Sequence, residues 1–66
     1  MIERPKPNFK LLTTLRKLGV RQIELAHAAR IDPSIISKAI NGWLTLGPDD
    51  QQRIAQSLDV PVKDIF

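Results

Sequence analysis

The fold of this 66-residue chain is decided by one stretch, Gln22-Ile23-Glu24-Leu25-Ala26-His27-Ala28-Ala29-Arg30-Ile31-Asp32-Pro33-Ser34-Ile35-Ile36-Ser37-Lys38-Ala39-Ile40-Asn41. This stretch predicts two short amphipathic helices joined by a tight turn. The second helix has a clear start signal. Asp32 is an N-cap whose carboxylate can accept from free backbone N–H groups, and Pro33 occupies the first helical position, where no N–H group is missed. Two helices joined in this way form a helix-turn-helix motif.

The second predicted helix, residues 33–41, carries polar and apolar side chains on opposite sides. At about 100° per residue, the polar and basic side chains fall within an arc of roughly 100°. The polar face consists of Ser34, Ser37, Lys38 and Asn41, and the apolar side of Ile35, Ile36, Ala39 and Ile40. Short serine side chains let a helix backbone lie close to base edges and phosphates. Lys38 could then reach guanine and Asn41 adenine in a major groove, or either could contact phosphate.

A polar face opposite an apolar one is also typical of any solvent-exposed helix, so this helix alone does not indicate a function. The preceding helix changes this interpretation, because the side chains on one of its sides are small and apolar. Its predicted inward stripe consists of Ile23, Leu25, Ala26 and Ala29. Ala26 is small enough for two helices to cross closely, and the turn that follows buries only Ile31. A closely crossed pair of this kind favours a helix-turn-helix that binds DNA.

Further helices are predicted on both sides of the motif. The first has Asn8 as N-cap and ends at Gly19. Its inward residues are predicted to be Phe9, Leu12 and Leu15, with Leu11 and Leu18 left open. A later helix opens at Gly47-Pro48-Asp49-Asp50, where two carboxylates lie at the positive end of the helix dipole. The rest of the predicted core is Ile54, Ala55 and Leu58 on that helix, then Val60, Val62, Ile65 and Phe66 in a last turn or short helix, although Phe66 could instead lie on a partner.

Over residues 10–66 the chain resembles the Cro and phage-repressor (Xre-like) type of helix-turn-helix regulators. The resemblance lies in Gly19-Val20-Arg21-Gln22, Leu25-Ala26, Ile36-Ser37, Asn41-Gly42, Ile54-Ala55 and Leu58-Asp59-Val60. It implies an all-α fold, a compact five-helix phage-repressor-like DNA-binding domain with the helix-turn-helix at its second and third helices. It also implies that the third helix enters the major groove and that a homodimer, at least on DNA, reads a two-fold symmetric operator.

The resemblance also implies roles for individual residues. Base reading falls on Pro33, Ser34 and Lys38, and a phosphate contact falls on Gln22. We expect further contacts to the DNA backbone from Arg21, Ser37, Asn41, Arg30, Arg4 and Lys6, and from the loop after Asn41.

Three positions depart from the family pattern. Arg30 stands where a turn glycine is usual, and a left-handed conformation there costs a residue with a side chain roughly 1 kcal/mol. Arg21 stands where Ser or Thr usually caps the second helix. Gln51 replaces an apolar residue, a gap that Leu44 or Leu46 could fill.

The length fits one small domain, whose core is marginal unless it is well packed or dimerised. Ten basic against seven acidic residues give a formal charge of +3, and most of the cations precede Asn41. Residues 1–7 are predicted to form an extended basic arm, because Arg4-Pro5-Lys6-Pro7 cannot be helical. The arm could touch phosphate or be a disordered terminus that happens to be basic. Residues 8–66 are predicted to form the DNA-binding domain.

Trp43 could cover the core, lie at a dimer seam or flank the DNA backbone, and we expect it to cover the core.

An enzyme is not predicted, because the chain lacks a catalytic constellation. It has one histidine and no cysteine or tyrosine, so we expect no metal site, no cofactor and no small-molecule substrate. His27 is predicted to face solvent on the second helix of the motif. No apolar run approaches the roughly 20 residues that span a bilayer, and no membrane partner is expected. The expected location is the bacterial cytoplasm, for a nucleoid-associated protein of bacterial or phage origin.

These observations predict a sequence-specific regulator of transcription that binds double-stranded DNA, with repression in the manner of Cro as the expected action. The alternative is a protein-interaction module or antitoxin-type partner with the same fold. The third helix discriminates between them, because a protein that does not bind DNA tolerates acidic or bulky apolar residues on the face that Ser34, Ser37, Lys38 and Asn41 occupy here. The operator sequence and the choice between repressor, activator and antitoxin stay open.

Overall fold

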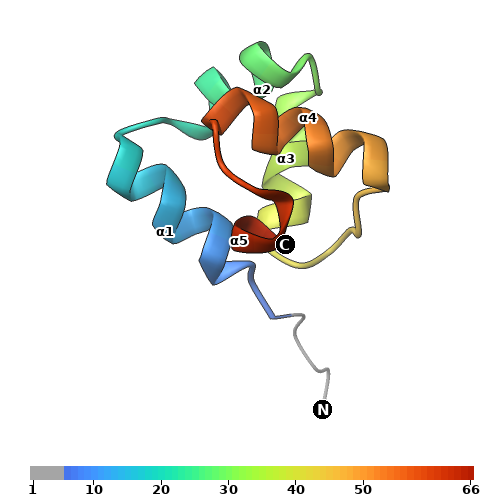
Figure 1. Cartoon of the computed structure of the whole chain (residues 1–66). Coiled ribbons are helices and arrows are strands. Elements are labelled where there is room, and N and C mark those ends of the chain that lie inside the picture. The colour runs from blue at the N-terminus through green and yellow to red at the C-terminus, as the bar shows by residue number, and fades with distance from the viewer. Residues whose placement is uncertain (1–5) are drawn as a thin grey trace.

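Five helices and no strands make up residues 6–66, the part of the chain that this computed structural model describes (Figure 1). The helices are α1 (Phe9–Leu18), α2 (Gln22–Ala29), α3 (Pro33–Ile40), α4 (Pro48–Leu58) and α5 (Val62–Ile65). The predicted all-α fold is therefore confirmed, with the helix-turn-helix at α2 and α3. The predicted arm falls partly on residues 1–5, including Arg4, which lie outside the described residues.

The helix boundaries follow the capping signals in the sequence. Asn8 caps α1 by accepting from the Leu11 N–H group, and Asp32 caps α3 by accepting from the Ser34 N–H group. Gly19 ends α1 in the left-handed conformation, with φ of 67°. Arg30 ends α2 in the same conformation, with φ of 58°, so the left-handed conformation predicted at this residue is confirmed.

The core lies where α2 packs on α3 and α4 and where α1 packs on α3 and α5. It is almost entirely aliphatic, and Ala26 and Ala29 allow α2 to approach its neighbours closely. Leu46, in the loop before α4, fills the position next to Gln51, whose side-chain N–H group donates to the Leu46 carbonyl at 3.1 Å. The buried side chains are Leu11, Leu15, Leu25, Ala26, Ala29, Ile31, Ile36, Ile40, Leu46, Ile54, Ala55, Leu58 and Ile65.

Some apolar residues predicted to face inward lie on the surface instead. Phe9 is 65% exposed because α1 turns Leu11 and Leu15 toward the core, which places Phe9 on the far side of the helix. Ile23 is 53% exposed for the same reason, since α2 buries Leu25. Trp43 does not cover the core: its side chain is 66% exposed on the loop after α3. Ile35 was also predicted to face inward, and it is exposed on α3 in the candidate site.

Asn8 joins both ends of the described chain to the end of α3. Its backbone N–H group donates to the carbonyl of Ile40 at 2.6 Å, and its side-chain amide donates to the carbonyl of Ile65 at 2.7 Å. The residues that precede α1 therefore start beside the C-terminal end of α3. No helix in residues 6–66 is long and apolar enough to cross a membrane.

Candidate nucleic-acid interface

The exposed face of α3 is the candidate interface, and its direction follows from the residues that the helix buries. Ile36 and Ile40 are fully buried one turn apart, so the opposite side of the helix points away from the core. At about 100° per residue, Lys38 lies at the centre of that outward side. Ser34 lies roughly 40° to one side of Lys38, and Ile35 roughly 60° to the other.

This orientation differs from the polar face expected from the sequence. Ile35 was predicted to lie on the apolar side, yet its side chain is 37% exposed beside Lys38. Ser37 was predicted to lie on the polar face, but it is half-buried. The i, i+4 pair of Ile36 and Ile40 is the signal that could have corrected the prediction, because it marks the centre of the buried stripe more sharply than the serines mark the exposed one.

Asp32 and Ser34 form a hydrogen-bonded unit at the start of α3. The carboxylate oxygen Oδ1 of Asp32 accepts from the backbone N–H group of Ser34 and from its hydroxyl group, each at 2.8 Å. The backbone hydrogen bond is the main reason why the pKa of Asp32 lies below its usual range, with the Ser34 hydroxyl and the charge of Lys38 acting in the same direction. Because the hydroxyl donates to Asp32, Ser34 presents acceptor lone pairs to a ligand.

The remaining residues predicted to read bases or contact the backbone near α3 are also on the surface. Pro33 is exposed at the first position of the helix and has no N–H group to offer, so it can make only apolar contacts there. Asn41 is exposed just after α3, and its side-chain amide donates to the carbonyl of Ser37 at 2.9 Å. The second N–H of this side-chain amide and the side-chain oxygen of Asn41 make no hydrogen bond at this end of the helix.

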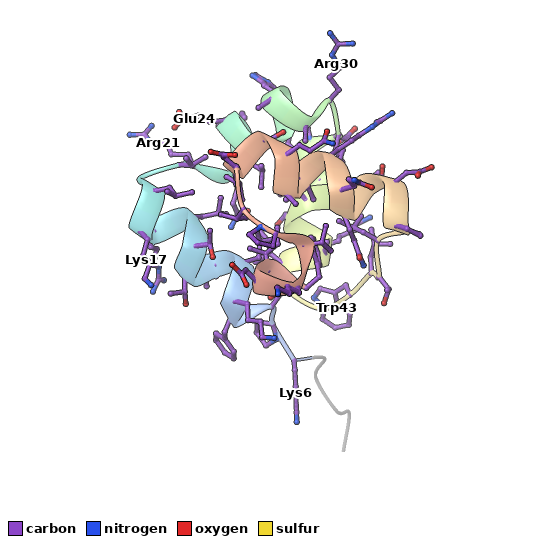
Figure 2. All side chains as sticks on the ribbon, viewed as in Figure 1. Lys6, Lys17, Arg21, Glu24, Arg30 and Trp43 are labelled. Carbon is purple, nitrogen blue, oxygen red and sulfur yellow. The ribbon has the colours of Figure 1, made fainter. Side chains whose placement is uncertain are left out.

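The start of α2 carries Arg21 and Gln22, both exposed, together with an acidic group. The Glu24 carboxylate accepts from the backbone N–H group of Arg21 at 3.3 Å, so it takes the capping role that the Arg21 side chain cannot perform. Arg21 and Glu24 project from the same part of the molecule (Figure 2). A phosphate at this helix end would therefore meet Glu24 as well as the two residues predicted to hold it.

Cationic side chains lie at both ends of the molecule along the direction of α3. Arg30, two residues before the N-cap of α3, extends from one end, and Lys6 extends from the other (Figure 2). The position of Lys6 follows from the hydrogen bond between Asn8 and Ile40, which the sequence does not reveal. The structure thus exposes Ser34 and Lys38 on α3 and Asn41 at its C-cap, and places Arg30 and Lys6 beyond the two ends of the helix. Arg4 lies outside the described residues.

Within residues 6–66, no three His, Cys, Asp or Glu side chains lie close enough together to hold a metal ion. His27 is exposed on α2, as predicted. The exposed face of α3 and its C-cap carries one amine, one hydroxyl, one aliphatic group and one amide, which belong to Lys38, Ser34, Ile35 and Asn41.

The five helices form the small all-α helix-turn-helix fold that was predicted from the sequence. Solved structures of two regulators have a similar fold. The restriction-modification controller protein C.AhdI from Aeromonas hydrophila superimposes with a TM-score of 0.84 at 20% sequence identity, over 89% of each chain. The clp gene regulator ClgR from C. glutamicum superimposes with a TM-score of 0.80 at 24% identity, over 88% of this chain and 75% of that one. No protein-family model matches the chain, and no curated protein matches it in sequence.

Proposed function

We propose that this chain is a sequence-specific regulator of transcription that binds double-stranded DNA through the exposed face of residues 33–41. The observation that carries the proposal is the surface of α3, where Ser34 and Lys38, with Asn41 at the C-cap, are exposed on the side opposite the buried Ile36 and Ile40. An eight-residue helix with short side chains beside its one lysine fits the major groove, which admits an α-helix. Two regulators share the fold, which supports this role.

The base-reading contacts we propose come from Pro33, Ser34 and Lys38. Lys38 donates to the N7 and O6 acceptors of guanine. Ser34 accepts from the amino group of adenine or cytosine, because its own proton is held by Asp32. Pro33 contributes an apolar contact at the edge of the groove.

Ile35 extends this base-reading set. It is exposed next to Lys38, and the only apolar feature that a base pair presents in the major groove is the C5-methyl group of thymine. We therefore propose that the half-site contains a thymine beside the base pair that Lys38 reads. The sequence did not suggest this contact, because Ile35 was predicted to face the core.

Contacts to the DNA backbone hold the helix in register without selecting a sequence. We propose Gln22 and Arg21 at the start of α2, Arg30 in the turn, and Lys6 and Arg4 in the arm for this role. Ser37 and Asn41 complete the set, with Asn41 the more accessible of the two because Ser37 is half-buried.

We further propose that a homodimer places two copies of α3 in successive major grooves, about 34 Å apart, on one face of a palindromic operator. Occupation of such an operator would repress transcription in the bacterial cytoplasm by excluding polymerase, as Cro-like proteins do.

Selection of bound sequences from a random duplex library tests this function. The selected duplex and a scrambled control are then titrated at two salt concentrations, because phosphate contacts alone give binding that falls with salt for every sequence. We expect an enriched palindrome with half-sites one helical turn apart. No enrichment, or equal loss of both duplexes with salt, would instead indicate a protein-interaction module or antitoxin-type partner.

A further inference from the structure

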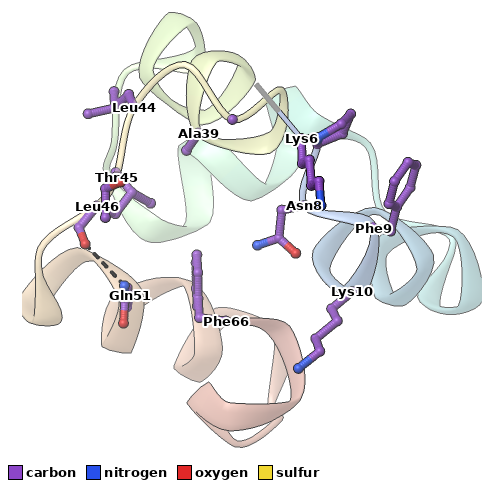
Figure 3. Close-up of a pocket in the computed structure, with 12 residues that line it drawn as sticks. Lys6, Asn8, Phe9, Lys10, Ala39, Leu44, Thr45, Leu46, Gln51 and Phe66 are labelled. Carbon is purple, nitrogen blue, oxygen red and sulfur yellow. Dashed lines mark hydrogen bonds between the residues drawn. The ribbon is translucent and has the colours of Figure 1, made fainter. Parts of the chain in front are cut away.

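A groove of about 570 Å³ opens beside the C-terminal end of α3 (Figure 3). Residues 6–10, which lead into α1, form one wall, and residues 44–46 with Gln51 form the opposite wall. The side chain of Phe66 points into the space between the two walls (Figure 3). The described residues that line the groove include none of those to which base reading is assigned. The groove is therefore a second candidate site, and its volume lies in the range of about 300 to 1,000 Å³ that is usual for small-molecule sites.

The wall formed by residues 6–10 is cationic. Lys6 and Lys10 line the groove, and no carboxylate side chain is among the described residues that line it. Lys10 lies in the first turn of α1, which contains no acidic residue. A lysine at that position is unfavourable on its own, because the start of a helix carries partial positive charge. An anion bound at this wall would relieve the repulsion and would face the amines of the two lysines.

The opposite side of the groove is apolar. Leu46 is buried, Leu44 is 37% exposed, and Phe66 and Ala39 are half-buried. Figure 3 shows the two lysines on one side of the space and the two leucines on the other, with Phe66 between them. A molecule in the groove would therefore meet positive charge at one end and hydrocarbon at the other.

The uncharged polar side chains of the groove are mostly engaged within the chain. Asn8 donates to the carbonyl of Ile65, and Gln51 donates to the carbonyl of Leu46. Thr45 is the remaining uncharged polar side chain among the described lining residues. A polar ligand needs several convergent hydrogen-bonding groups to fix its orientation. The free groups of this groove instead suit a ligand with one anionic group and an otherwise apolar body.

We propose that this groove binds an aliphatic carboxylate of medium chain length. The carboxylate lies at the two lysines and accepts charge-assisted hydrogen bonds from their amines. The hydrocarbon chain lies against the apolar side of the groove, where it is removed from water. The charge of the lining residues thus selects the head of the ligand, and their apolar side chains select its body.

The bound carboxylate would compete with DNA for Lys6, which the proposed function places at a phosphate. A ligand that holds Lys6 in the groove weakens DNA binding by the same factor by which DNA weakens ligand binding. Because phosphate contacts carry no sequence information, operator and scrambled duplex should lose affinity alike. This regulatory role rests on the proposed function, whereas the binding of the carboxylate does not.

Amide chemical shifts of the whole chain without DNA test the site, with octanoate as the probe below the concentration at which it forms micelles. We expect saturable shifts at residues 6–10, at residues 44–46 and at Phe66. Acetate carries the charge without the chain and should bind at least about tenfold more weakly than octanoate. Octanol carries the chain without the charge and should bind about fivefold more weakly, since ion pairs at exposed lysines are weak.

Two pairs of variants separate the charged and apolar parts of the site. Lys10→Gln should weaken octanoate binding about threefold and leave octanol binding unchanged. Its control is Lys17→Gln, which removes an exposed charge at the other end of α1 and should change neither. Leu44→Asp adds a carboxylate to the apolar side and should weaken octanoate binding about tenfold or more. Its control is Ile23→Asp, at an exposed aliphatic residue outside the groove. Circular dichroism shows whether each variant is folded.

Three outcomes would overturn the site: no saturable shift at the groove, octanol bound as tightly as octanoate, or equal weakening by a variant and its control. A separate titration with DNA tests the regulatory role, with acetate at equal concentration as the control for ionic strength. Octanoate should weaken DNA binding by the wild type and not by Lys6→Ala. Octanoate that binds in the groove and leaves the DNA affinity of the wild type unchanged would overturn that role. A chain that binds octanoate but no DNA would contradict the proposed function, and with it the regulatory role, while the site would stand.

Discussion

Asp32 holds Ser34 through two hydrogen bonds to the same carboxylate oxygen, one from the backbone N–H group and one from the hydroxyl group, each 2.8 Å long. The first bond caps α3, and the second fixes the direction of the serine proton. One residue therefore starts the candidate recognition helix and also determines what its neighbour can offer to a base.

The thermal stability of the chain should depend on the ionisation of Asp32. The folded-state pKa of this carboxyl is lowered, chiefly by the Ser34 backbone hydrogen bond, so its contribution to stability is complete above its unfolded pKa of about 4. That contribution is lost as the pH falls through the lower folded-state pKa. Melting curves between pH 2 and 6 should therefore show a steeper loss of Tm for the wild type than for Asp32→Asn.

The control for this measurement is Asp64→Asn, which removes an exposed carboxylate elsewhere on the surface. It should retain the wild-type acid dependence that Asp32→Asn lacks. If both variants follow the wild-type curve at every pH, Asp32 does not couple ionisation to folding in the way that the geometry indicates.

Replacement of Lys38 should change the specificity of DNA binding. Lys38→Ala removes the donor at the centre of the outward face of α3 and should cost roughly 1 to 3 kcal/mol on the selected operator, with relaxed preference at one base pair. Fluorescence anisotropy on the operator and on single-base variants measures the effect. Lys17→Ala is the charge-matched control on another helix and should preserve the preference. Equal losses for Lys38→Ala on operator and random DNA would exclude base reading by this residue.

Replacement of Lys6 should instead weaken binding to all sequences alike. Lys6 lies beyond the end of α3, where a phosphate contact carries no sequence information. Lys6→Ala should reduce the magnitude of the negative slope of log K against log salt by about 0.9 for each bound copy, because each copy neutralises one phosphate fewer than the wild type. Titrations of operator and scrambled duplex at several salt concentrations give this slope. A slope that stays at the wild-type value would show that the arm does not bind phosphate through Lys6, and Arg4→Ala provides an independent test of the same segment.

Ile35 should make the protein sensitive to the methyl group of thymine. Uracil in place of the thymine beside the Lys38-read pair should lower affinity about fourfold, which corresponds to roughly one buried methyl group. Ile35→Ala should bind the thymine and uracil duplexes equally. Both proteins are therefore compared on both duplexes. If the wild type binds the thymine and uracil duplexes equally, Ile35 does not read a base, even if operator binding is otherwise specific.

The turn at Arg30 stores strain that a glycine should release. Arg30 adopts φ of 58°, and Arg30→Gly should raise the free energy of unfolding by about 1 kcal/mol. Arg30→Ala separates the two roles of this residue, because it removes the charge and keeps the side-chain strain. Both variants should bind DNA more weakly if the guanidinium contacts phosphate. Urea titrations measure stability, and a glycine variant no more stable than the alanine variant would show that this turn is relaxed.

Much of the fold was predictable because the decisive signals act within one helical turn. The cap at Asp32, Pro33 at the first helical position and Gly19 at the end of α1 each fix a boundary through groups a few residues away. The helix-turn-helix and the helices on both sides of it follow from such signals, whereas the count of five was implied by the family resemblance. In the candidate site, the exposure of Lys38 and Asn41 followed from the same periodicity.

The rotation of each helix about its own axis depended on the tertiary structure. Phe9, Ile23, Ile35 and Trp43 are all apolar, and composition places any of them in a core. Which side of a helix is buried depends on how all five helices pack together. In α3 the buried stripe is centred on Ile36 and Ile40, which leaves Ile35 exposed on the candidate DNA surface.

The sequence by itself thus determined which elements form and the class of fold they make, since capping and periodicity are local. The tertiary structure decided which residues share a surface. Asn8 reaches the carbonyl of Ile65, 57 residues away, and through its bond to Ile40 sets Lys6 at the end of α3. Such contacts join segments that only the packed core brings together, so no local pattern in the chain predicts them.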